Sequence, residues 1–179
     1  NTAAAVTSGS STQVHLFKMQ ETTPNAATNY ATPINGQLWD TTEHRGTCVC
    51  AAAGTFSNWK IVLPTAPGGV ASYTFTLRVN QVDTAAIITI SGTSTVGTYL
   101  SSIALADGDE LAIKSVPSGT PTASLASISW DFNPTTAQQA VYGGGGNAQG
   151  PVAVNRTNRV FYPIDEVNWD SGNAVDLAS

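Results

Sequence analysis

Residues 72–80 read SYTFTLRVN, and apolar side chains occupy every second position of this stretch: Tyr73, Phe75, Leu77 and Val79. Polar side chains fill the positions between them. Because successive residues of a β-strand point to opposite faces of a sheet, a period of two predicts a strand with one buried and one wet face. An amphipathic helix would need a period near 3.6 residues. The stretch therefore predicts a half-buried strand.

Similar stretches recur along the chain and are separated by Gly, Asp, Asn or Pro. They are TAAIITISG at 84–92, SSIALADGDELAIKSV at 101–116 and SLASISWDF at 124–132. Short strands at this spacing, without helical patterns between them, are typical of antiparallel sandwiches and barrels. We therefore predict an all-β protein, an antiparallel β-sandwich of the jelly-roll type. An immunoglobulin-like sandwich is the alternative, although two cysteines one residue apart cannot supply the cross-core pair of that fold.

Two of these stretches carry more specific expectations. Residues 85–90 are almost continuously apolar, which indicates burial on both faces or at a subunit contact. In the stretch 101–116, the turn-forming residues DGDE at 107–110 separate two alternating runs. This arrangement predicts a β-hairpin.

The composition limits the partners that the chain can have. Only 11% of its 179 residues are charged, the net charge is −5, and seven Lys and Arg residues are spread singly. Ordinary soluble proteins have roughly 25% charged residues. The chain therefore lacks the basic footprint that a nucleic-acid backbone requires, and we predict no nucleic-acid binding. No apolar run approaches the roughly 18 residues that span a bilayer, so we predict no membrane insertion.

The chain divides into three parts. Residues 1–12 are small and polar and predict a flexible N-terminal arm, because they bury too little surface to offset the entropy of ordering. Residues 13–142 contain the predicted strands and form the β-sandwich domain. Residues 143–179 begin with four consecutive glycines, which predict a hinge. The remaining tail is too short to fold alone, and we expect it to pack on its own or a neighbouring subunit.

The segment from about residue 46 to residue 132 resembles β-domains in predicted bacteriophage virion proteins and in bacterial surface proteins. The resemblance is carried by SNWKIVLPTAPGG at 57–69, SYTFTLRVNQVDTAAIITISGT at 72–93, SSIALADGDELAIKSVPSGTPTAS at 101–124 and ISWDF at 128–132. The order of these stretches is also similar to the tumour-necrosis-factor-like jelly rolls, which assemble as trimers. The resemblance implies a jelly roll and a homo-oligomer, a trimer or higher. It marks no functional residues.

The densest group of reactive side chains lies in residues 40–50. Cys48 and Cys50 would point to the same side of an extended chain, and His44 lies close in sequence. A structural zinc site needs four ligands with wider gaps, so we predict no metal site. The two thiols are interpreted either as small buried hydrophobes or as a bridge between subunits.

The sequence offers no catalytic constellation. It has two histidines and no Gly-x-Ser-x-Gly elbow. The carboxylates of Asp107, Asp109 and Glu110 could serve glycoside hydrolysis or bind calcium, but Asp and Gly at these positions are also what a tight turn needs. We therefore predict no catalytic residues, no cofactor and no enzymatic activity.

Several aromatic residues are predicted to lie in loops or in the tail, where they would stack on sugar rings or anchor an interface. Asn155 begins a formal glycosylation motif, which we interpret as a chance occurrence. The candidate ligand or interface aromatics are Trp39, Tyr99, Tyr142, Phe161, Tyr162 and Trp169.

These features predict a non-enzymatic structural protein on a virion surface, either a capsid decoration protein or a tail-associated subunit. Its expected partners are copies of itself and other virion proteins, and its expected location is the virion surface or the extracellular space. One alternative is a carbohydrate-binding adhesin or receptor-binding domain that recognises surface glycans. Another is a subunit of a bacterial extracellular fibre, in which the N-terminal segment would complete a neighbour's sheet.

Overall fold

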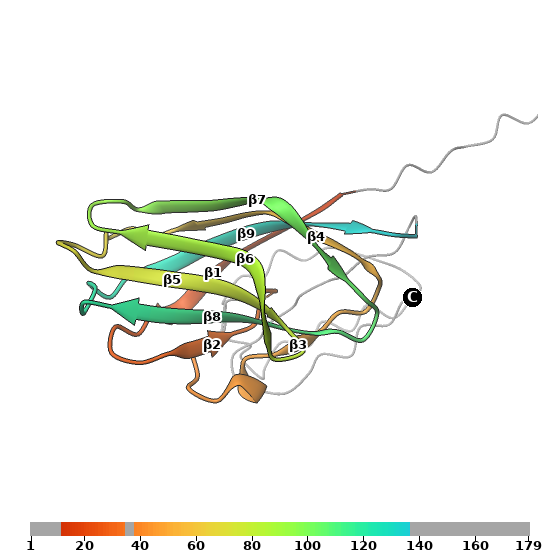
Figure 1. Ribbon diagram of the computed structural model, residues 1–179, viewed down its shortest axis with the longest axis horizontal. Helices are drawn as coiled ribbons and strands as arrows, with labels where there is room; N and C mark the ends of the chain where they lie inside the picture. Colours follow the sequence, from red (N-terminus) through yellow and green to blue (C-terminus); the bar gives the residue numbers. More distant parts are fainter. Residues whose placement is uncertain (1–11, 35–37, 137–179) are drawn as a thin grey trace, which may run out of the picture.

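The computed structural model describes residues 12–34 and 38–136, and these form two β-sheets packed face to face (Figure 1). The described part contains nine strands and one short 3₁₀ helix. The elements are β1 (Gln13–Thr22), β2 (Asn29–Ala31), η1 (Glu43–Arg45), β3 (Cys48–Val49), β4 (Gly54–Val62), β5 (Ser72–Val79), β6 (Val82–Ser91), β7 (Val96–Leu105), β8 (Glu110–Ser118) and β9 (Leu125–Pro134).

The antiparallel strand pairs are nested, one outside the next, around the turn between β5 and β6. Strand β5 pairs with β6, β4 with β7, β2 and β3 with β8, and β1 with β9, and every pair is antiparallel. The chain is therefore one long ribbon that folds back on itself. Two further pairings, β4 with β9 and β5 with β8, roll this ribbon into two sheets.

The sheets have the strand orders β1-β9-β4-β7 and β2-β8-β5-β6, with β3 pairing with β8 outside that path. A folded-back ribbon rolled into two sheets, here one of four strands and one of five including β3, is the jelly roll, which confirms the predicted fold class. An immunoglobulin-like sandwich would place the first strand beside the second. Here β1 lies beside β9, so the alternative does not apply.

The turn at which the ribbon folds back has only two residues. Asn80 and Gln81 have φ values of 51° and 65° and join the paired residues Val79 and Val82. Two-residue hairpin loops favour positive φ at both positions because that twist matches the twist of the strands, and Asn tolerates this conformation well. The turn thus sets the register of the β5–β6 pair, from which the other pairs are nested.

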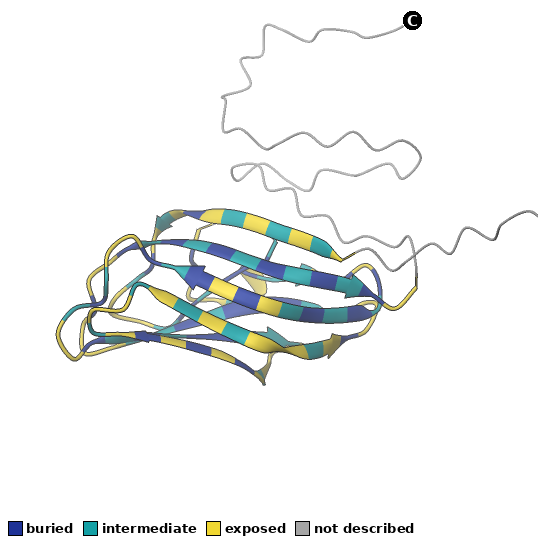
Figure 2. Ribbon diagram, turned by 90° about the horizontal axis from the view of Figure 1, so that it is seen from above, coloured by how far each residue is buried: buried dark blue, intermediate teal, exposed yellow. Residues whose placement is uncertain are grey.

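The core lies between the sheets, and its aromatic side chains come from both of them. Strands β4, β5 and β9 alternate buried and more exposed residues, which appears as alternating bands along the strands in Figure 2. Burying each large apolar side chain contributes roughly 1.5–3 kcal/mol to folding. The largest fully buried side chains are Trp59, Trp130, Tyr73, Phe56, Phe75 and Phe132. On β9, Ile128, Trp130 and Phe132 are buried and share the inner face of the strand.

Two expectations about individual strands need correction. The apolar run 85–90 lies in β6, where Ala86, Ile88 and Ile90 are buried but the side chain of Ile87 is 48% exposed. The strand is therefore covered on one face only within a single chain, so burial on both faces is wrong, and the subunit contact stays a prediction. The run before the DGDE turn lies in β7 and the run after it lies in β8, and these strands belong to different sheets. The segment is a crossing between sheets and not a hairpin.

The physical reason for this crossing lies in the hydrogen bonds of the turn. The amide of Gly108, which has a φ of 90°, donates to the carbonyl of Cys50, and the amide of Cys50 donates to the carbonyl of Asp109, each at 2.8 Å. The side chain of Asp109 accepts from the amide of Ala106 at 2.7 Å and from the side chain of Asn80 at 2.8 Å. These contacts bind the turn to the segment after β3 and to the β5–β6 hairpin, so the two strands diverge.

Candidate functional surfaces

A groove runs over β9 on the outer face of the β1-β9-β4-β7 sheet, and we call it the β9 groove. Its volume is about 430 Å³. The floor is low because β9 presents Ser127 and Ser129 outward between taller side chains on the flanking strands. Pairing places Ser129 opposite Leu16 of β1 and Lys60 of β4, and Ser127 opposite Val62 of β4. The groove is lined by Leu16, Phe17, Lys60, Val62, Ser127, Ile128 and Ser129.

The rim of the β9 groove is basic. Lys60 lines the groove, and Lys18 lies on β1 opposite Ser127, on the other side of β9. Every other cation in the described residues, Arg45, Arg78 and Lys114, makes an ion pair, whereas these two lysines have no ion-pair partner there. The nearby acidic residue Asp131 accepts a hydrogen bond from Asn58 at 2.7 Å. The groove therefore combines apolar side chains with two free ammonium groups.

A second surface lies where the two sheets meet along β6 and β7. These strands are the last in their sheets, and each pairs with a neighbour on one side only. Four of their apolar side chains are exposed: Val82 by 66%, Ile87 by 48%, Val96 by 46% and Leu100 by 77%. We call these four residues and their strands the β6–β7 edge.

The β6–β7 edge lacks the free charges and prolines that commonly protect exposed strands. Natural edge strands are commonly guarded against pairing with other chains by Lys or other charges, by Pro or by bulges. The sequences of β6 and β7, VDTAAIITIS and VGTYLSSIAL, contain no Lys, Arg, Glu or Pro. The single acidic residue, Asp83, is already bound by Arg78 and Lys114. The pairing of β6 with β5 and that of β7 with β4 each contain one register irregularity, and apart from Asp83 both strands are uncharged.

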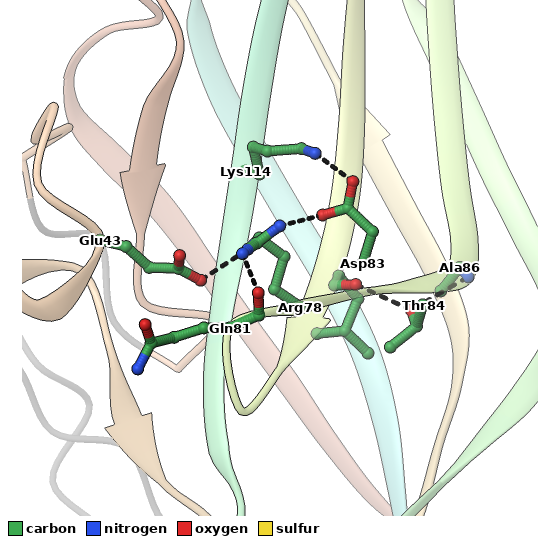
Figure 3. A network of polar contacts seen from close by, with 8 residues as sticks. Glu43, Arg78, Gln81, Asp83, Thr84, Ala86 and Lys114 are labelled. Carbon is green, nitrogen blue, oxygen red and sulfur yellow. Dashed lines mark hydrogen bonds and ion pairs between the residues drawn. The ribbon is translucent and has the colours of Figure 1, made fainter.

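Arg78 is the centre of a polar network on the outer face of the other sheet (Figure 3). Its Nε donates to Glu43 of η1 at 2.6 Å, and its other nitrogens donate to Asp83 and to the carbonyl of Gln81. Its guanidinium also lies 5.8 Å from the centre of the Tyr30 ring. The hydrogen bond to Glu43 is the main reason why the pKa of Arg78 is raised. The network thus ties η1, β2 and the β5–β6 turn together.

The charges of this network compensate one another. Burial would raise the pKa of Asp83, but hydrogen bonds from Lys114 and Arg78 outweigh this effect and lower it. Two cations therefore face two carboxylates, those of Glu43 and Asp83. Beside them, Thr84 fills the β6 bulge by donating to the carbonyl of Leu77 at 2.8 Å. We interpret this cluster as structural.

The structure corrects the placement of the two predicted aromatics that it describes. Trp39 is only 7% exposed and packs in the core, where its ring centroid lies 6.2 Å from that of Phe75. Tyr99 lies within β7, is half-buried and packs against the core. The predicted loop position of Trp39 is confirmed, but its ring is buried in the core, and the predicted loop position of Tyr99 is wrong because this residue lies in a strand. Four other aromatics lie outside the described residues: Tyr142, Phe161, Tyr162 and Trp169.

Both cysteines are free thiols. Cys50 is buried, and its Sγ lies 3.0 Å from the carbonyl oxygen of Ala52. Burial raises the pKa of Cys48 to about 12, with a further contribution from neighbouring Cys50. Burial also raises the pKa of Cys50. The sequence allowed two interpretations of the thiols. Cys50 is a buried thiol, as the first interpretation states. The second interpretation, a bridge between subunits, stays a prediction for the half-buried Cys48.

The remaining candidate groups do not converge. His44 lies on η1, and in residues 12–34 and 38–136 no three side chains of His, Cys, Asp or Glu gather as a metal site would require. Asp109 is engaged in the turn described above, which agrees with its interpretation as a turn residue. In the same part of the chain, no helix is long and apolar enough to cross a membrane.

Sequence reasoning missed the β9 groove and anticipated only the β6 part of the β6–β7 edge, as the apolar run 85–90 with its possible subunit contact. The signal for the β9 groove was the pair of serines at 127 and 129, small outward residues on a strand whose inner residues are large. The signal for the β6–β7 edge was the absence of Lys, Arg, Glu and Pro from residues 82–91 and 96–105. Neither signal shows which strands are neighbours, and both surfaces depend on that. No family model and no curated protein matches this chain.

Proposed function

We propose that this chain is a non-enzymatic structural subunit that assembles with copies of itself on the surface of a virion. The observation that supports this proposal best is the β6–β7 edge, with two ten-residue strands that carry exposed apolar side chains and no free charge. Such an edge is a hazard for a solitary chain, because it can pair with any other exposed strand. In an assembly the same edge is covered.

A second copy of the chain fits this edge better than a charged partner. Its exposed groups are Val82, Ile87, Val96 and Leu100, so association would bury apolar surface without breaking existing ion pairs. Jelly rolls recur in viral capsid and lectin domains, and the low charge of the whole sequence suits a particle surface. The carbohydrate-binding alternative loses Trp39 as a stacking residue, because that side chain is buried.

The oligomeric state of the full chain tests the assembly. We expect sedimentation at micromolar concentration to give a multiple of the 18.5 kDa chain mass. Leu100→Asp places an unpaired carboxylate in the contact, which costs about 2 kcal/mol and weakens association roughly thirtyfold. Leu16→Asp is the matched control, since Leu16 is 75% exposed and lies on the opposite edge strand of the same sheet, while Leu100 is 77% exposed. Circular dichroism confirms that both variants are folded.

A wild-type chain that stays monomeric at this concentration would contradict the proposal, as would a Leu100→Asp chain that assembles normally. The location is tested separately by electron microscopy with an antibody against the folded chain. Labelling of the surface of intact virus particles is the expected result. Labelling of long extracellular filaments would instead support the fibre alternative.

A further inference from the structure

We propose that the β9 groove binds a segment of the same chain, residues 160–166, which read VFYPIDE. This inference concerns a surface apart from the β6–β7 edge and does not depend on assembly. The segment lies outside the described residues, and its chemistry is taken from the sequence alone.

The first argument is chemical complementarity. The segment offers consecutive apolar residues followed at once by Asp165 and Glu166. The groove offers the apolar side chains of Leu16 and Val62 beside the ammonium groups of Lys18 and Lys60, which have no ion-pair partner in the described residues. Four of the twelve acidic residues of the chain lie beyond residue 136, at 165, 166, 170 and 176, against two basic residues. An acidic and apolar tail therefore matches a basic and apolar groove.

The second argument is shape. A groove with a floor of two serines and raised flanks on β1 and β4 accepts an extended chain better than a helix, whose diameter is roughly 10 Å or more. Pro163 restricts the residue before it to extended conformations, so this part of the tail is biased toward the backbone that fits. Less conformational freedom is then lost on binding.

The third argument is reach. Strand β9 ends at Pro134, five to seven residues beyond Ser129 and Ser127, so the groove lies about 17–24 Å back along the strand. Residues 135–159 separate the strand from the segment, and a random coil of the same number of residues has a root-mean-square span of about 25–30 Å. Because the two lengths match, the tail is held near its own groove at an effective concentration on the order of a millimolar. At micromolar protein concentration, binding within one chain is therefore favoured over binding to a neighbour.

Zero-length cross-linking of the full chain tests this proposal. A carbodiimide joins an amine to a carboxylate in direct contact, and mass spectrometry identifies the two residues. We expect links from Lys60 or Lys18 to Asp165 or Glu166, with the Lys114–Asp83 pair as an internal positive control. In a mixture of light and nitrogen-15-labelled protein, we expect links within light or within heavy chains only.

Two variants separate this proposal from the proposed function. Leu16→Asp keeps both lysines but repels the acidic segment, and we expect the link yield to fall about tenfold while the oligomeric state is unchanged. Leu100→Asp should dissociate the assembly and leave the link yield unchanged. Absence of the links in the wild-type chain, links between light and heavy chains, or an unchanged yield in Leu16→Asp would each overturn the intramolecular docking.

Discussion

His15 and Trp130 stack across the β1–β9 pair, with ring centroids 4.3 Å apart and ring planes inclined by 15°. The two residues are directly opposite in the register of these strands. The Trp130 indole also donates a hydrogen bond to the carbonyl of Pro33, and its ring stacks on Phe56 of β4 at 4.6 Å. One side chain thus joins the edge strand β1, the segment after β2 and the centre of the sheet.

Burial of His15 in this stack makes the stability of the fold depend on pH. Burial lowers the pKa of His15 from 6.5 to about 4, although Asp131 acts in the opposite direction. Because the unfolded chain binds the proton first as the pH falls, stability is full above pH 6.5 and decreases between pH 6.5 and 4. We expect a loss of about 2 kcal/mol between pH 7.5 and pH 4.5, measured by urea denaturation. His15→Phe should lose less than half as much over the same interval. An equal loss of stability in the wild-type and His15→Phe proteins would show that His15 is not the cause of the pH dependence.

Gly97 is required where β6 and β7 approach each other. A Cβ atom at this position would lie 2.2 Å from Cγ2 of Ile88, which is buried on β6. Gly97→Ala should therefore destabilise the fold by about 1–3 kcal/mol in chemical denaturation. In an Ile88→Ala background the added methyl group finds space, so the loss should be smaller there. Equal losses in the two backgrounds would show that the close approach is not the cause.

Arg78 should matter much more than the exposed Arg45. The side chains of Arg78 and Glu43 are 15% and 13% exposed, whereas the side chain of Arg45 is 76% exposed in its ion pair with Asp40. Arg78→Met leaves Glu43 without its partner, and we expect a loss of about 2 kcal/mol, against less than about 0.5 kcal/mol for Arg45→Met. The double variant Arg78→Met/Glu43→Gln should be more stable than the sum of its single losses predicts. If the stability losses of the two single variants simply add up in the double variant, Arg78 and Glu43 are not directly coupled.

The thiols should react slowly in the folded chain. The thiolate is the reactive form, and burial raises the pKa of Cys48 to about 12 and also raises that of Cys50. We expect modification by a thiol-reactive disulfide at pH 8 to be about a hundredfold slower in buffer than in denaturant. Reaction rates measured on the Cys48→Ala and Cys50→Ala variants show which thiol gives which rate. Fast reaction of both thiols in the folded chain would contradict this burial, and a dimer resistant to denaturant but sensitive to reductant would support the bridge through Cys48.

The strands themselves were predictable because their period is local. Tyr73, Phe75 and Leu77 on β5, and Ile128, Trp130 and Phe132 on β9, face the core as their alternation predicted. The alternation is a property of consecutive residues and survives any choice of neighbouring strand. The DGDE turn was also recognisable, since Gly108 adopts a positive φ that glycine tolerates.

The surfaces were not predictable, because they depend on pairing between residues far apart in sequence. Leu16, Lys60 and Ser129 meet only because β1 and β4 both flank β9. Trp39 appeared accessible because polar residues surround it in sequence, but the core of the sandwich buries it. Likewise, the separation of β7 from β8 follows from hydrogen bonds of Asp109 to Asn80 and Cys50, which lie about 30 and 60 residues away in the sequence.

The sequence by itself determined that this is an all-β chain with alternating strands and a low-charge surface, since side-chain period and composition act over a few residues. Only the tertiary structure decided that Lys18 and Lys60 flank one groove and that two strands without a free charge lie at the same edge. The physical reason is that the alternation within a strand determines which of its residues face the core. The rolling of the folded-back ribbon determines which strands become neighbours.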